Sequence, residues 1–147
     1  MKTKIFSKMI AVAAMLWLSF APSQAKAQVM NPYMLTNDLL CPVMVRYTIF
    51  TTNTLTGVCD MACDGGIVTL PPGPGAPPTI IPWNPACTGC KVTVSIFNIG
   101  GTPIVPPLTA SFPPPPGPTV MGPAPAGCSP TGNVMMDVLP NATHIHP

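Results

Sequence analysis

The sequence predicts an all-β fold: a small, disulfide-stabilised β-sandwich or partly open barrel with long proline-rich loops, preceded by a cleaved signal peptide. Several short stretches carry β-branched residues at alternate positions and are separated by turns rich in proline and glycine. The chain has six cysteines, an even number that suits a disulfide framework in an exported protein. Outside the N-terminal segment, no stretch of useful length has the periodicity of an amphipathic helix.

Residues 1–27 have the pattern of a secretory signal peptide. Three lysines form a positive start and are followed by the apolar run Met9–Ala21. This run of 13 residues is short for a membrane span. Ala25–Ala27 supplies a cleavage site of small residues, so we expect cleavage before Gln28. The alternative is an uncleaved membrane anchor.

Residues 28–147 are expected to form a single β-domain with very little charge. Arg46 and Lys91 stand against four aspartates, so the formal net charge is −2. Only six residues of this domain are charged, whereas about a quarter of the residues of an ordinary soluble domain are charged. Weak charge repulsion favours association, and the basic footprint of nucleic-acid-binding proteins is absent. Disorder is the competing interpretation because proline is abundant, but the many valines, isoleucines and leucines favour a folded core.

The two best predicted strands are Lys91–Ile99 and Cys41–Thr52. In the first, alternation places Val92, Val94, Ile96 and Asn98 on one face. In the second, both faces are largely apolar, which suggests a strand covered on both sides or packed against another chain. Further strands are expected at Ile67–Leu70, at Asn133–Leu139 and, as an edge strand because of Pro82, at Thr79–Trp83.

The remaining segments are predicted to be irregular. Residues 28–40 are a lead-in, and Val58–Gly66 is a cysteine-clamped loop. Prolines break Thr102–Phe112, so only its ends are candidates for edge strands. Pro113–Gly127 is a proline-rich loop or arm that favours an extended conformation. Asn141–Pro147 is a tail.

All six cysteines are predicted to form disulfides, and no residue is predicted to be catalytic, to bind a cofactor or to bind a metal. One hypothesis pairs Cys41 with Cys87 or Cys90, which would tie the starts of the two best strands together. The same hypothesis pairs Cys128 with Cys59 or Cys63. The complete set is Cys41, Cys59, Cys63, Cys87, Cys90 and Cys128.

Two alternatives concern the same cysteines. The pairs Cys59/Cys63 and Cys87/Cys90 could supply four thiolates to a zinc ion. The second pair is also a CxxC motif, but a redox site of that type starts a helix, and here the motif leads into a strand. Export favours disulfides over both alternatives.

Other side chains invite weaker interpretations. Asp60 and Asp64 suggest calcium, but the twelfth position of such a loop, Pro71, is not the glutamate that it needs. His144 and His146 would face one way on an extended segment and could bind a metal weakly, although a mobile tail is the simpler interpretation. No serine lies in a recognisable nucleophile motif. Four aromatic residues are expected in the core, with a ligand platform as the alternative: Tyr33, Tyr47, Trp83 and Phe97.

These features favour an exported, non-enzymatic structural or self-assembling protein at the cell surface or outside the cell, with the periplasm as a further location if the source is bacterial. Its expected partner is a second copy or an extracellular protein. It is not expected to bind nucleic acid, nor to have a transmembrane segment after the signal peptide is cleaved. The alternative is a monomeric secreted module that binds a carbohydrate, a peptide or a host protein. An enzyme or metal protein is the third hypothesis.

Overall fold

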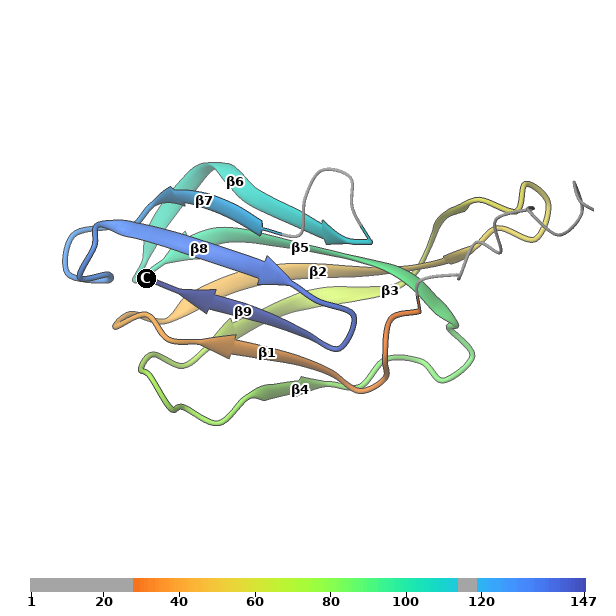
Figure 1. Cartoon of the computed structure of the whole chain (residues 1–147), viewed down its shortest axis with the longest axis horizontal. Coiled ribbons are helices and arrows are strands. Elements are labelled where there is room, and N and C mark those ends of the chain that lie inside the picture. Colours follow the sequence, from red (N-terminus) through yellow and green to blue (C-terminus); the bar gives the residue numbers. More distant parts are fainter. Residues whose placement is uncertain (1–27, 114–118) are drawn as a thin grey trace, which may run out of the picture.

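The computed structural model describes residues 28–113 and 119–147, and in these ranges the chain forms nine β-strands and no helix. The predicted signal peptide and residues 114–118 of the proline-rich segment lie outside the described residues. The strands form two sheets (Figure 1). In chain order they are β1 (Tyr33–Asn37), β2 (Val43–Thr52), β3 (Cys59–Leu70), β4 (Thr79–Ile81), β5 (Gly89–Ile99), β6 (Thr102–Phe112), β7 (Thr119–Pro123), β8 (Asn133–Val138) and β9 (Ala142–His146).

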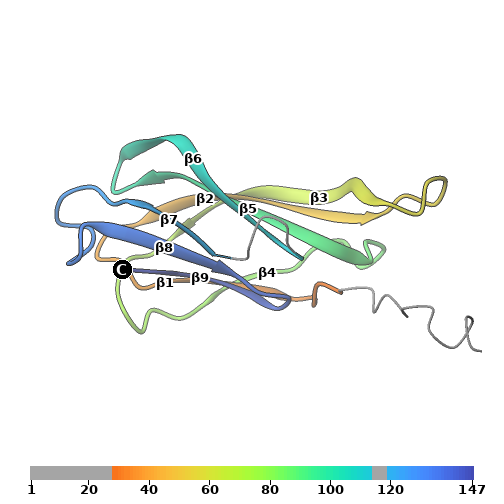
Figure 2. The same cartoon turned by 45° about the horizontal axis from the view of Figure 1, so that its top comes forward.

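The first sheet has the strand order β4-β1-β9-β8-β7 and the second has the order β3-β2-β5-β6. Every pairing is antiparallel except that of β1 with β9, which is parallel. Figure 2 shows the sheets as two layers, with the hairpin of β2 and β3 extending beyond them at one end. The predicted all-β fold with disulfides is confirmed.

A single apolar core lies between the layers. Each sheet turns the alternate residues of its strands inward, as the period of two along a strand requires. The first sheet contributes Tyr33, Leu35, Met136 and Ile145, all less than 2% exposed, and the second contributes Val45, Ile49, Val94 and Ile96, all at 0%. No helix in the described ranges has the length and apolar character needed to cross a membrane.

The long predicted strands are confirmed, with one shift in their pattern. The strand predicted at Lys91–Ile99 is β5, and the one predicted at Cys41–Thr52 is β2. The register between β5 and its neighbours shifts at Phe97. Because this bulge inserts one residue, Ile99 enters the core in place of Asn98. The strands predicted at Thr79–Trp83 and Asn133–Leu139 are β4, at a sheet edge, and β8.

The prediction of a C-terminal tail is wrong. Residues 142–146 form β9, which lies between β1 and β8 in the first sheet. Thr143 and Ile145 are fully buried, and the hydroxyls of Thr143 and Tyr33 hydrogen-bond at 2.9 Å. The segment is short, and its polar residues at alternate positions belong to a strand whose outer face meets solvent, which explains why it resembles a tail.

Four other segments predicted to be irregular contain strands. The lead-in contains β1, and residues 119–123 of the proline-rich segment form β7. The cysteine-clamped loop is the first half of β3, continuous with the strand predicted at Ile67–Leu70. β6 spans Thr102–Phe112, with its pairing to β5 interrupted at residues 104–107, and its prolines lie at a sheet edge where they are tolerated.

The disulfide Cys41–Cys128 joins the two sheets. Cys41 precedes β2 in the second sheet, and Cys128 lies between β7 and β8 of the first. Gly100 packs against this bridge: its φ is +57°, and a Cβ there would lie 3.0 Å from Sγ of Cys128. Only glycine meets both requirements without strain.

The hypothesis that Cys41 pairs with Cys87 or Cys90 is therefore wrong. β2 and β5 are antiparallel, with Val43 opposite Ile99. The start of β2 thus lies beside the end of β5, whereas Cys87 and Cys90 lie at or before the start of β5, at the opposite end of the sheet.

Replacing Cys41 and Cys128 by alanine should lower the free energy of unfolding by about 4–5 kcal/mol, because the bridge closes a loop of 87 residues. The measurement is unfolding in guanidinium chloride without reductant, after peptide mapping of the two remaining bridges. Val105→Ala, at an 86% exposed position, should change stability by less than about 0.5 kcal/mol. A loss below about 1 kcal/mol in the double variant would contradict the prediction.

Candidate functional site

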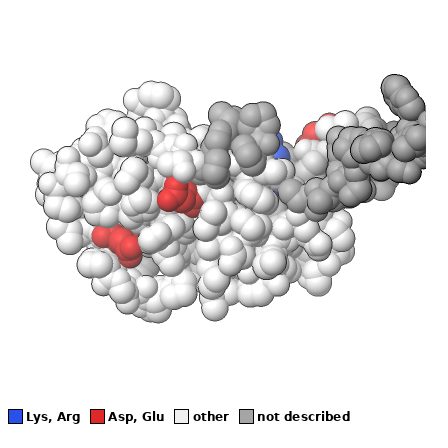
Figure 3. Space-filling model, in the orientation of Figure 1, with Lys and Arg blue, Asp and Glu red and all other residues white. Residues whose placement is uncertain are grey.

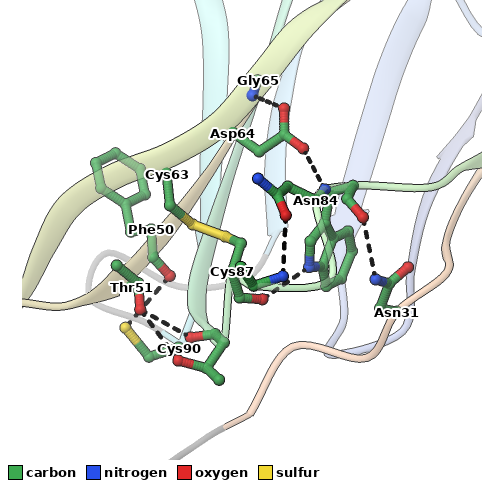
Figure 4. Close-up of a disulfide and its surroundings, with 12 residues drawn as sticks. Asn31, Phe50, Thr51, Cys63, Asp64, Gly65, Asn84, Cys87 and Cys90 are labelled. Atoms are coloured by element: carbon green, nitrogen blue, oxygen red, sulfur yellow. Dashed lines mark hydrogen bonds between the residues drawn. A yellow bond between two sulfur atoms is a disulfide. The ribbon is translucent and has the colours of Figure 1, made fainter.

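The other four cysteines gather at one end of the second sheet. The bridges Cys59–Cys90 and Cys63–Cys87 connect β3 to β5 and to the segment before it, across the strand β2 that separates them. Figure 4 shows the second bridge with its surroundings. The sequence identified these two pairs as alternative zinc ligands, and the structure brings them together as disulfides. In the described ranges, no group of three or more histidine, cysteine, aspartate or glutamate side chains is placed to bind a metal.

Both bridges differ from the predicted pairing, which joined Cys128 to Cys59 or Cys63. The CxxC cysteines are not bonded to each other, since each is bonded to β3. The two cysteines of β3 are thus each bonded to one of the two cysteines around the start of β5. This arrangement fixes the relative positions of three adjacent strands at the end of the sheet where the β2–β3 hairpin projects.

Asp64 holds the loop before β5 in place. Its carboxylate accepts hydrogen bonds from the backbone N–H groups of Gly65 at 2.7 Å and Asn84 at 2.8 Å (Figure 4). Within the same loop, the indole N–H of Trp83 donates to the carbonyl of Cys87 at 3.1 Å. Both oxygens of Asp64 are therefore engaged with backbone donors, which gives this residue a structural role in place of the calcium site considered above.

The two histidines lie on the outer face of β9. Nε2 of His144 is 2.7 Å from Oδ2 of Asp38, and Nε2 of His146 is 3.0 Å from Oδ2 of Asp137. Because Asp38 follows β1 and Asp137 is in β8, the two contacts link β9 to both of its neighbours. On the face shown in Figure 3, charged side chains are few and scattered.

Hydrogen bonding lowers the pKa of Asp137. The hydroxyl of Thr119 in β7 donates to one carboxylate oxygen, and His146 contacts the other. These contacts favour the charged carboxylate over the protonated form. Asp137 thus connects β7, β8 and β9 on the outer face of the first sheet.

Trp83 belongs to the core, which agrees with the expectation for Tyr33 and Trp83. Its side chain is 5% exposed, and its ring centroid lies 6.4 Å from that of Tyr33. Burial raises the pKa of Tyr33. A hollow of about 530 Å³ lies over Trp83 and is bordered by Gln28, Val29, Met30, Asn31, Pro85, Cys87, Thr88 and Gly89.

A smaller groove of about 250 Å³ lies on the outer face of the second sheet. Sheet order brings its residues together from three adjacent strands: Arg46 of β2, Ser95 and Phe97 of β5, and Pro107 and Thr109 of β6. The guanidinium carbon of Arg46 lies 6.0 Å from the centroid of the Phe97 ring. The sequence does not reveal this group, because its residues are far apart in the chain and only their positions on the outer faces of neighbouring strands relate them.

The edge strand β3 carries exposed apolar side chains. Ile67 is 55% exposed and Met61 is 47% exposed. At the tip of the hairpin that joins β2 to β3, Leu55 is 94% exposed and Val58 is 54% exposed. These four side chains form the apolar border of the second sheet, which we call the β3 border.

Comparisons of the chain with protein-family models, with curated proteins and with solved structures find no match.

The variant Asp137→Asn should lose a pH-dependent part of the stability. A carboxylate whose pKa is lowered by folding stabilises the protein fully above its unfolded pKa of about 4, and this contribution disappears as the pH falls through the lower folded pKa. Unfolding of the wild type, measured from pH 7 to pH 2, should therefore show a decrease below about pH 4 that is smaller in the variant. Asp60→Asn, an exposed position on β3, is the charge-matched control. Identical pH profiles for wild type and Asp137→Asn would contradict the assignment.

Proposed function

We propose that this chain is an exported, disulfide-stabilised β-sandwich with a structural role, and that copies of it associate through the β3 border. The single observation that carries the proposal is the free edge of β3, a strand of 12 residues. Three disulfides are consistent with an extracellular or secreted protein. The proposed location is the cell surface or the surrounding medium.

The four sheet edges differ in how well they are protected. An exposed strand edge presents unpaired N–H and C=O groups that can pair with another chain, and short length or proline prevents this. β4 has three residues and lies between Pro78 and Pro82, and β7 has five residues and ends at Pro123. β6 contains three prolines, and its Leu108 lies against Gly122 of β7. β3 alone among these edges is both long and free of proline.

The regular part of the β3 edge is its second half. The register with β2 shifts beside Cys63, and a bulge there protects the first half of the strand. From Asp64 to Leu70 the pairing with β2 is continuous. We propose that this run pairs antiparallel with the same run of a second copy around a twofold axis, which joins two four-stranded sheets into one.

Charge and exposed apolar surface both favour this association. Residues 28–147 carry six charged side chains, so two copies repel each other weakly. Leu55 and Val58 project at the end of the hairpin. Burial of their apolar surface against a neighbour would stabilise the association by about 25 cal/mol for each Å² removed from water. The hairpin tip supplies a second contact beyond the paired strands, which extends a pair into a larger assembly.

The variant Ile67→Lys should weaken self-association by about tenfold or more, because it places like charges opposite each other in the paired edge. Sedimentation velocity over a wide concentration range measures the association of wild type and variant. The matched control is Val105→Lys, which adds the same charge to the proline-protected edge strand β6.

A wild-type protein that remains monomeric at the highest soluble concentration would overturn the proposal. An equal loss of association in Val105→Lys would also overturn it, because net charge and not the β3 edge would then control association. Intact disulfides in both variants, shown by peptide mapping, establish that neither has misfolded.

A further inference from the structure

We propose that the outer face of the second sheet binds a linear acidic polysaccharide, with a sugar carboxylate held at Arg46 in the groove that this residue forms with Ser95, Phe97, Pro107 and Thr109. The groove lies on β2, β5 and β6, and its Arg46 is opposite Ile67 of the β3 border in the register of β2 with β3. Because the two sites adjoin, ligand binding is measured at a concentration at which the protein is monomeric.

Both cations of residues 28–147 lie on this face. Arg46 of β2 is opposite Ser95, and Lys91 of β5 is opposite Phe50. The outward side chains of these two paired strands therefore carry one cation toward each end of the sheet. Asp38 and Asp137 lie next to or in strands of the first sheet, Asp64 contacts the loop before β5, and Asp60 is on β3. The outward side chains of β2 and β5 thus carry two cations and no carboxylate in a chain with a net charge of −2, which points to an anionic ligand.

Arg46 is prepared for a carboxylate. Its side chain is exposed, and among the described side chains it has no ion-pair partner. The guanidinium carbon lies over the face of the Phe97 ring, 6.0 Å from its centroid, which is within the range of a cation–π contact. A guanidinium in such a position can bind a carboxylate through two parallel hydrogen bonds.

Hydroxyl groups lie directly beside the cation. Ser95 and Thr109 face each other across β5 and β6, and their hydroxyls hydrogen-bond at 2.8 Å. One row further along, Thr93 and Ser111 repeat the arrangement at 2.9 Å. The Ser95–Thr109 pair is exposed, whereas Ser111 is buried. A hydroxyl both donates and accepts, so the exposed pair matches the hydroxyls of a sugar.

Apolar groups complete the groove. Phe97 and Pro107 line it on β5 and on the segment of β6 where the register with β5 is interrupted. Sugar rings have an apolar face of C–H groups that packs on aromatic and proline rings. A small number of polar side chains in the groove then fixes the orientation of the sugar. The mixture of one cation, paired hydroxyls and ring surfaces favours a sugar acid over an acidic peptide.

The two ends of the face explain why a polymer fits better than a single sugar. Lys91 lies 5.2 Å from the centroid of Phe50, which repeats the cation–aromatic pairing of Arg46 with Phe97. Lys91 and Ser95 are four residues apart on β5, about 13 Å along a strand. A polymer with a carboxylate on each sugar can meet both cations while it lies across the hydroxyl rows.

Fluorescence polarisation of a labelled oligogalacturonate tests the proposal with the full mature chain. Wild type should bind it and should not bind the same polymer with its carboxylates methyl-esterified. Arg46→Gln should weaken binding by about tenfold or more, and Arg46→Lys should restore only part of it, because an ammonium group cannot form the paired hydrogen bonds. Lys91→Gln should have a smaller effect than Arg46→Gln, because Lys91 lies outside the groove.

Thr56→Asp is the matched control, since it changes the net charge by the same amount at the exposed hairpin tip. It should bind almost as well as wild type, and all variants should keep three disulfides and the wild-type circular dichroism. Three results would overturn the proposal: no binding of oligogalacturonate by wild type, an equal loss in Thr56→Asp and Arg46→Gln, or equally tight, Arg46-dependent binding of poly-glutamate, which would make the ligand an acidic peptide.

Discussion

The antiparallel pairing of β2 with β5 is the constraint on which the rest of the structure depends. It places the start of β2 beside the end of β5, so Cys41 bonds to Cys128 in the other sheet and not to Cys87 or Cys90. At the opposite end, the same pairing leaves the cysteines of β3 and those around the start of β5 on either side of β2, where two bridges join them. It also aligns Arg46 with Ser95 and Phe50 with Lys91 on the outer face.

A low charge content and a high disulfide content are connected in this chain. With few charged side chains, the outer faces of both sheets depend on hydroxyls and on a small number of polar contacts for their solvation. The charged residues that remain are used locally: Asp64 holds a loop, and Asp38 and Asp137 contact the histidines of β9. Three covalent bridges add to the stability that the core between the sheets provides.

The sequence predicted the strands in which β-branched residues alternate over many positions, which are β2 and β5, and it predicted the fold class that they imply. It could not predict β9, because a five-residue strand with two histidines has the composition of a tail until β1 and β8 are known to lie beside it. The disulfide pairing and the groove at Arg46 depend on strand order and direction, and neither is contained in the local pattern of any one strand.

The position of β9 has a consequence for how the chain acquires its structure. The first sheet has β9, the last strand of the described residues, at its centre, in parallel pairing with β1. β1 and β8 can therefore be joined only after residue 146 has left the ribosome and any export channel. The second sheet, whose four strands end at Phe112, can assemble earlier, so its apolar side stays uncovered until β9 has been synthesised.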